Sequence, residues 1–141
     1  MRDGRAVLSF VQQQRRTRWN AGYLEMLTAF GHTFTGDCDQ ARAVGKNALG
    51  LASRTDDARI WNERALGVAR VDAWCGAADD AVALLREVSS SRPGIGPTAI
   101  TRDPLFTVPL AQSPAFRALS AQLESTVLTG SAVESNTVSA H

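Results

Sequence analysis

The prolines of this chain are confined to one short stretch. All five lie between Arg92 and Pro114, and the 91 residues before that stretch contain none. Proline inside a helix removes a backbone hydrogen bond and clashes with the preceding turn, at a cost of about 3 kcal/mol. The proline-free part is rich in alanine, leucine, arginine, glutamine and glutamate, which are good helix formers. It is therefore predicted to be entirely helical.

Apolar residues at helical spacing predict five helices before the proline-rich stretch. They are expected over residues 5–14, 18–35, 38–52, about 57–75 and 78–90. Gly36 and Gly76 are expected to end the second and fourth helices. Asp37 is placed to cap the third helix, and Asp56 or Asp57 to cap the fourth.

The proline-rich stretch predicts a change of architecture. Pro93 is expected to stop the fifth helix, and residues 98–112 to form short turns or a broken helix. Ser113 as N-cap and Pro114 at the first helical position then predict a last helix. Residues 125–141 are small, polar and unperiodic, which predicts a disordered tail.

An internal repeat has an offset of 40 residues. Residues 35–49 align with residues 75–89, so that Gly36 meets Gly76 and Ala41 meets Ala81, and residues 3–11 can be laid on the same template. Each unit is a helix, a glycine-containing turn and a second helix. Repeats of this length are typical of solenoids, in which each hairpin needs neighbours to bury its apolar face.

These units resemble the tetratricopeptide repeat. In the second unit the matching positions are Val68 and Ala69 at the Leu-Gly pair, Gly76 at the turn, Ala81 and Leu85 at the packing positions of the second helix, and Pro93 at the closing proline. The first unit matches at Ala29, Gly36, Ala41 and Ala48. It departs at Gly45, where a large residue is usual, and the offset exceeds the 34 residues of the family. The resemblance implies an all-α solenoid of antiparallel hairpins, a tetratricopeptide-like superhelix.

Residues 98–124 are similar to the terminal segment of helical arrays in bacterial multidomain signalling proteins. The match is carried by Asp103, Pro104, Leu110, Pro114, Phe116 and Leu119. It implies a loop that crosses the last hairpin and a capping helix that covers its apolar edge. The expected organisation is a repeat domain over 1–124, with a partial unit at about 5–16, units at 18–53 and 56–92, and a cap at 98–124. In those proteins such arrays follow kinase, cyclase or DNA-binding modules.

No pattern of catalytic or metal-binding residues stands out. GxSxG, HExxH, CxxC and GxGxxG are all absent, and Gly45-Lys46 lacks the rest of a phosphate loop. His32 with Cys38 or Cys75 offers a nucleophile–base couple in principle, but packing of both cysteines as small apolar groups is the preferred interpretation. The chain is expected not to be an enzyme and to bind no cofactor or metal.

Net charge and cysteine content limit the kinds of partner and the cellular location that the sequence predicts. A net charge of +1 argues against nucleic acid, and the cluster Arg15, Arg16 and Arg18 is interpreted as a solvated helix end. Neither a signal peptide nor a membrane-spanning segment is indicated. Cys38 and Cys75 are interpreted as reduced thiols, which predicts a cytoplasmic location.

His32 and Asp72 occupy equivalent positions of the two units. Two polar groups there allow an ion pair across the hairpin interface, which would raise the pKa of His32. The alternative, which we prefer, is that each side chain tilts toward water.

Four residues are candidates for partner binding. The resemblance places Phe30 and Phe34 of the first unit, and Arg70 and Trp74 of the second, toward a concave groove. Exposed aromatic and arginine side chains are frequent binding hot spots. Packing in the core is an alternative for Phe34 and Trp74. The predicted function is a non-catalytic module that binds a protein or peptide, at the C-terminal end of a larger bacterial signalling or regulatory protein.

The helix at residues 5–14 provides an alternative function. It looks like the second helix of a hairpin that lacks its first, so part of its apolar face would be uncovered. A second copy of the chain could cover that face, and the chain would then serve as a structural or dimerisation segment.

Overall fold

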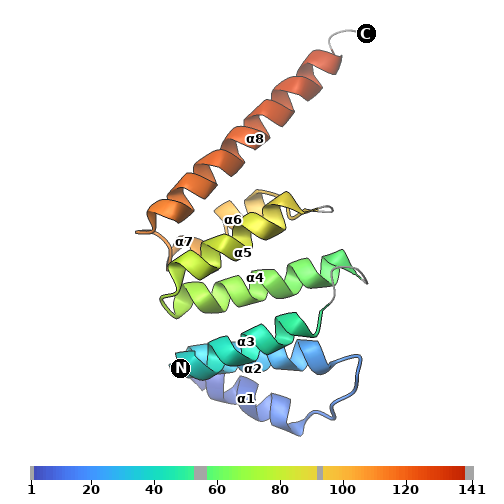
Figure 1. The fold of residues 1–141 in the computed structure, drawn as a ribbon, viewed down its shortest axis with the longest axis vertical. Helices are drawn as coiled ribbons and strands as arrows, with labels where there is room; N and C mark the ends of the chain where they lie inside the picture. The colour runs from blue at the N-terminus through green and yellow to red at the C-terminus, as the bar shows by residue number, and fades with distance from the viewer. Residues whose placement is uncertain (1, 53–56, 92–93, 139–141) are drawn as a thin grey trace.

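The computed structural model describes residues 2–52, 57–91 and 94–138, and within these ranges all regular structure is helical. The helices are α1 (Arg2–Gln13), α2 (Ala21–Thr35), α3 (Cys38–Gly50), α4 (Ala58–Trp74), α5 (Ala78–Ser90), α6 (Thr98–Thr101), α7 (Pro104–Thr107) and α8 (Pro114–Val138) (Figure 1). The all-α prediction is confirmed. Pro93 and Asp56 lie outside the described residues.

Capping residues set most helix starts where the sequence predicted them. The Asp37 carboxylate accepts a hydrogen bond from the Gln40 backbone at the start of α3, and Asp57 accepts from the backbone of Arg59 and Ile60 at the start of α4. Helix α2 begins three residues later than expected. The reason is a local turn in which Thr17 N–H donates to Asn20 Oδ1 at 2.7 Å and Asn20 N–H to Thr17 Oγ1 at 3.3 Å.

The 40-residue repeat is reproduced in the backbone of the two turns. Gly36 and Gly76 adopt left-handed φ angles of 85° and 80°. The amide of the following residue donates to the carbonyl of His32 in the first turn (2.9 Å) and of Asp72 in the second (2.8 Å). Only glycine adopts this conformation without strain, because it has no Cβ. The two hairpins therefore turn in the same way.

Small residues let neighbouring helices approach closely. Four alanines at equivalent positions of the repeat are completely buried. They are Ala29 with Ala69, and Ala41 with Ala81, each pair 40 residues apart in the sequence. Among the first five helices, each packs on the one that follows it, from α1 on α2 through to α4 on α5, and α2 also packs on α4 (Figure 1). Helices α2 and α4 run parallel to each other. Gly22 lies against Arg64 near the start of both helices, and Met26 lies against Gly67 further along both.

The proline-rich stretch covers the end of the last hairpin. Phe106 of α7 and Ile100 of α6 are completely buried, and Phe116 and Leu119 of α8 join the core that contains Leu85. The Ser113 hydroxyl accepts a hydrogen bond from the Phe116 backbone at 3.2 Å, as expected of an N-cap. This segment thus closes the apolar edge of α4 and α5.

Helix α8 is longer than the sequence suggested. It continues to Val138, whereas a disordered tail was expected from residue 125, and its C-terminal part extends away from the other helices (Figure 1). Residues 125–138 contain no proline, and helical backbone satisfies its own hydrogen bonds. Thr126 and Thr129 add side-chain bonds to the carbonyls of Gln122 and Ser125. Residues 139–141 of the expected tail lie outside the described residues.

Candidate interaction surface

Phe34 and Trp74 form a repeated pair of exposed aromatic side chains. Phe34 lies near the C-terminal end of α2 and is 41% exposed; Trp74 ends α4 and is 46% exposed. Their numbers differ by the repeat offset, so they are equivalent residues of two parallel, contacting helices. Both residues therefore lie at the same end of these neighbouring helices, and Phe34 Cβ also lies beside Gly4 of α1.

Phe30 and Arg70 occupy the preceding turn of the same helices, but both are engaged inside the protein. Phe30 is partly buried against the core, with its ring over Gly67. The Arg70 guanidinium donates to one carboxylate oxygen of Asp103, from Nε at 3.0 Å and from Nη2 at 2.8 Å, and lies 5.4 Å from the centre of the Phe106 ring. Arg70 therefore links α4 to α7, and partner binding by it stays a prediction.

The two cysteines lie directly beside this surface and are joined. A disulfide connects Cys38, the first residue of α3, to Cys75, which follows Trp74, and the Cα atoms are 5.5 Å apart. The prediction of two reduced thiols is wrong. Because both cysteines are bonded in the disulfide, neither can supply the thiolate that a nucleophile–base couple with His32 would need. Helices α3 and α4 pack on each other with the start of α3 beside the end of α4, which the 37-residue separation in sequence did not reveal. The disulfide also removes the cysteine argument for a cytoplasmic location.

Asp72 pairs with Arg42 rather than with His32. Arg42 of α3 donates from Nε to Asp72 at 2.9 Å and from Nη2 to Asp80 of α5 at 2.5 Å, so one guanidinium joins three helices. His32 instead faces Asp37, with Nδ1 and Oδ2 3.9 Å apart. Neither interpretation of this pair holds for Asp72, because its carboxylate bonds to Arg42 rather than to His32 and is buried rather than turned toward water.

Burial controls the ionisation of Asp72. The carboxylate is nearly inaccessible, and this desolvation raises its pKa above the ordinary value despite the bonds from Arg42. Arg42 is more exposed, and its hydrogen bond to Asp72 raises its own pKa. The cost of desolvation therefore falls on the acid and not on the base.

Glu25 is the second buried acid of the array. Its carboxylate accepts hydrogen bonds from Arg16 and, at 3.0 Å, from Asn47 of α3. Burial alone would raise the pKa of Glu25, but these two donors and the Arg16 charge together lower it. The expected solvated cluster is therefore only partly right, since Arg16, although half exposed, pairs with Glu25, while Arg18 stacks on Trp19 at 4.5 Å.

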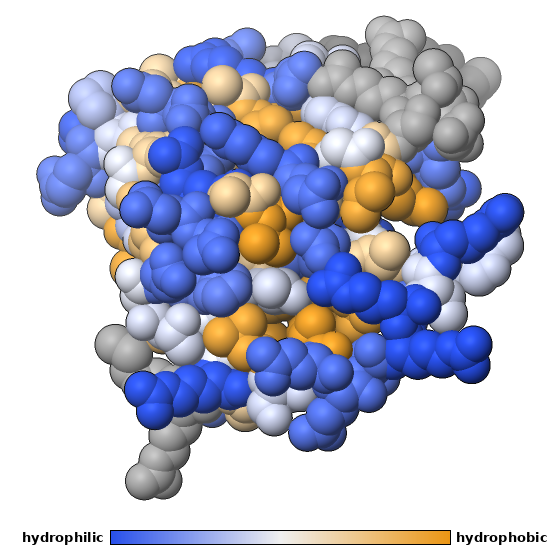
Figure 2. All heavy atoms as spheres, turned by 60° about the horizontal axis from the view of Figure 1, so that its bottom comes forward, coloured by the Kyte–Doolittle hydropathy of each residue, from blue (hydrophilic) through white to orange (hydrophobic). Residues whose placement is uncertain are grey.

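Helix α1 leaves part of its apolar face uncovered. Gly4 and Gly31 permit its close approach to α2, and Val11 is buried there. Phe10 remains 50% exposed. In the view that brings the α1 end forward, hydrophobic residues lie in gaps between hydrophilic ones and do not form one continuous patch (Figure 2).

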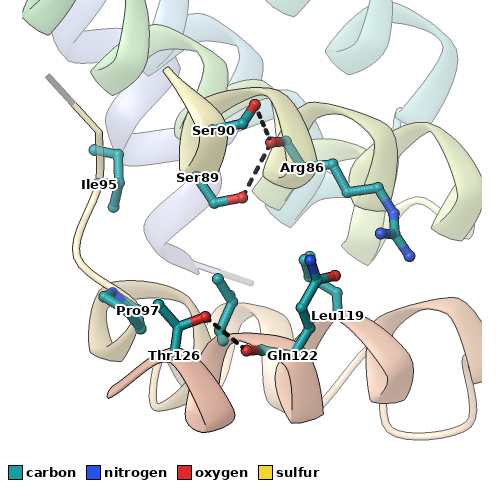
Figure 3. A pocket seen from close by; sticks show the side chains of 9 residues that line it. Arg86, Ser89, Ser90, Ile95, Pro97, Leu119, Gln122 and Thr126 are labelled. Carbon is teal, nitrogen blue, oxygen red and sulfur yellow. Dashed lines mark hydrogen bonds between the residues drawn. The ribbon is translucent and has the colours of Figure 1, made fainter. Parts of the chain in front are cut away.

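A pocket between α5 and α8 was missed by sequence reasoning (Figure 3). Its lining combines apolar residues with hydroxyl and amide groups: Ile95, Pro97, Leu119, Leu123, Arg86, Ser89, Ser90, Gln122 and Thr126. The three hydroxyls already donate to backbone carbonyls of Arg86 or Gln122. Nothing in the sequence signalled it, because it arises only where the capping helix crosses the last hairpin.

In the described part of the chain, no three histidine, cysteine or acidic side chains gather as a metal site would require. Among the helices of the same ranges, none combines the length and apolarity needed to cross a membrane. Comparison of the chain with protein-family models, curated protein sequences and solved structures gives no match.

Proposed function

We propose that the chain is a non-catalytic protein-interaction module whose partner surface is centred on Phe34 and Trp74. One observation carries the proposal: the two residues are equivalent in the repeat, and both expose a large aromatic side chain. Burying exposed aromatic area is the strongest single source of hot-spot energy. A partner peptide with two apolar side chains would engage both rings.

The proposed scaffold is a tetratricopeptide-like solenoid. Two hairpins with the same turn, closed by a capping segment, support it. The Cys38–Cys75 disulfide and the Arg42 ion pairs hold the two hairpins together beside the proposed surface. A rigid surface loses little conformational entropy on binding. The resemblance of the cap further suggests a place at the C-terminal end of a bacterial signalling protein.

The test uses selection of peptides from a random displayed library against the full chain. We expect selected peptides to lose about tenfold or more in affinity for a Phe34→Ala, Trp74→Ala double variant. A Val108→Ala variant, which also truncates an exposed apolar residue, is the matched control and should bind normally. Equal binding to the double variant and the wild type, or failure to enrich any peptide, contradicts the proposal.

Self-association through α1 is a second candidate, favoured by the half-exposed Phe10. Sedimentation of the full chain should then show a dimer that a Phe10→Ser variant converts to monomer. A wild-type chain that is monomeric throughout contradicts this candidate and leaves the peptide proposal intact.

A further inference from the structure

The N-terminal ends of α2 and α4 form a second surface, at the other end of these helices from Phe34 and Trp74. We call it the arginine pocket, and define it by Arg18, Trp19, Gly22, Leu51, Ile60 and Arg64. A rise of about 1.5 Å per residue puts it about 20 Å from the aromatic pair along the helix axes. The two surfaces are therefore separate.

Large apolar side chains stand exposed around this pocket. Trp19 is 82% exposed, Leu51 56% and Ile60 45%. They come from three different elements, namely the α1–α2 connection, the residue after α3 and the first turn of α4. Gly22 has no side chain, and the Arg64 guanidinium occupies the space over it, so this guanidinium forms the floor of the pocket. An apolar side chain of a partner can enter above it, between the three apolar walls.

The charged groups of the pocket are predominantly basic. Arg18 and Arg64 face it, and within the described ranges neither forms an ion pair with an acidic side chain. Among the described residues of the lining, Asp57 is the single acidic one, and its Oδ1 already accepts the amides of Arg59 and Ile60 as the cap of α4. In the part of the chain that the structure describes, the pocket thus offers two cations without an ion-pair partner, Arg18 stacked on Trp19 and Arg64 over Gly22, beside exposed apolar surface.

We infer that the arginine pocket docks an acidic peptide segment that carries large apolar residues. The apolar side chain would pack between Trp19, Leu51 and Ile60, and neighbouring carboxylates would pair with Arg18 and Arg64. Arginine binds carboxylates through parallel hydrogen bonds, and opposite charge also steers the encounter. Nucleic acid fits less well, because the chain as a whole has a net charge of only +1 and phosphate binding needs a larger basic excess.

The test measures fluorescence anisotropy of three labelled probes with the full chain. The first is a short peptide with leucine and phenylalanine flanked on both sides by aspartates; in the second, lysines replace the aspartates. The third is a single-stranded oligothymidylate. We expect the acidic peptide to bind and the basic peptide to bind about tenfold or more weakly, with affinity for the acidic peptide falling as salt is added.

Two charge-reversal variants locate the site. Arg64→Glu should weaken binding of the acidic peptide about tenfold or more, whereas Arg59→Glu should leave it unchanged. Arg59 carries the same charge in the same helix and is exposed, but it does not line the pocket. Circular dichroism melting of both variants checks that they remain folded, and Leu51→Ser offers an uncharged second variant, with the same loss expected.

Three results overturn the inference: no binding of the acidic peptide, equal binding of the acidic and basic peptides, or tighter binding of the oligonucleotide. Unchanged affinity in both Arg64→Glu and Leu51→Ser also overturns it. A Phe34→Ala, Trp74→Ala variant should bind this probe normally, so failure here is distinguishable from failure of the proposed function.

Discussion

Gly45 is a buried glycine in the middle of α3 with room for a methyl group. A Cβ added there would lie 3.7 Å from Val68 and 3.9 Å from Ala29, which is ordinary van der Waals contact. Glycine in a helix interior costs about 0.5–1 kcal/mol relative to alanine, through backbone entropy. We expect Gly45→Ala to raise the free energy of unfolding by that amount, measured by urea denaturation.

Gly31 provides the contrast. A Cβ there would lie 2.7 Å from the Leu8 side chain and 3.2 Å from the Gly4 carbonyl oxygen. The same change is therefore expected to destabilise the protein by about 1–3 kcal/mol, because α1 must move away from α2. Equal effects at Gly45 and Gly31 would contradict the described packing.

The buried acids predict opposite contributions to stability as pH changes. Bonds from Arg16 and Asn47 lower the folded pKa of Glu25 below its ordinary value of 4.5, so its stabilising contribution is present above that pH and lost as pH falls. Burial raises the folded pKa of Asp72, so its contribution is present at low pH and lost as pH rises.

Glu25→Gln tests the first of these statements. The variant should be less stable than wild type at neutral pH, because the Arg16 and Asn47 donors lose a charged acceptor. The difference should shrink as pH falls below 4.5, where the wild-type carboxylate takes up a proton. Urea denaturation at a series of pH values measures it, and a difference that does not depend on pH would contradict the described contacts.

At the scale of elements, the short helix α7 holds the cap against the array. Phe106 is completely buried, and Val108, two residues later, is 62% exposed. Phe106→Ala should cost about 3–5 kcal/mol by leaving a cavity in the core. Val108→Ala should change stability by less than about 0.5 kcal/mol. Thermal unfolding of both variants gives the comparison, and similar values for the two would show that α7 does not pack as described.

Sequence patterns were most reliable where one physical signal dominated. Helix α5 begins and ends where it was predicted. Gly76 makes the turn that precedes it, and its buried face is formed by Ala81, Leu85 and Val88. The end of α8 was missed because residues beyond 124 have no apolar stripe, and the helix continues there through backbone hydrogen bonds and the side-chain bonds of Thr126 and Thr129.

Candidate binding residues were predictable only in part. The equivalence of Phe34 and Trp74 follows from the 40-residue offset, and both are exposed. The partner of Arg70 could not be read in the same way, because Asp103 reaches it only after the cap folds back across α4. The arginine pocket likewise needs three segments to meet. Contacts between distant elements are the part that local patterns do not encode.

At the scale of the whole molecule, the disulfide crosses the boundary between the two repeat units. Cys38 belongs to the first unit and Cys75 to the second, and Arg42 bridges α3, α4 and α5 from the same side. The repeat contained a usable signal: Cys38 closely follows Gly36, and Cys75 directly precedes Gly76. Helices α2 and α4 contact each other in parallel, so the turns that follow them lie at the same end, which brings the two cysteines together.

Removal of the disulfide should therefore lower the stability of the entire array. A bond that closes 37 residues of chain restricts the unfolded state by about 3–4 kcal/mol in the chain-entropy description. We expect urea denaturation with an added phosphine reductant to show a loss of up to this size. A Cys38→Ser, Cys75→Ser double variant should have the stability of the reduced protein and show no response to the reductant. If wild type and double variant are equally stable without reductant, the cysteines are not joined in the folded protein, and the Arg42 ion pairs remain as the polar link on that side of the hairpins.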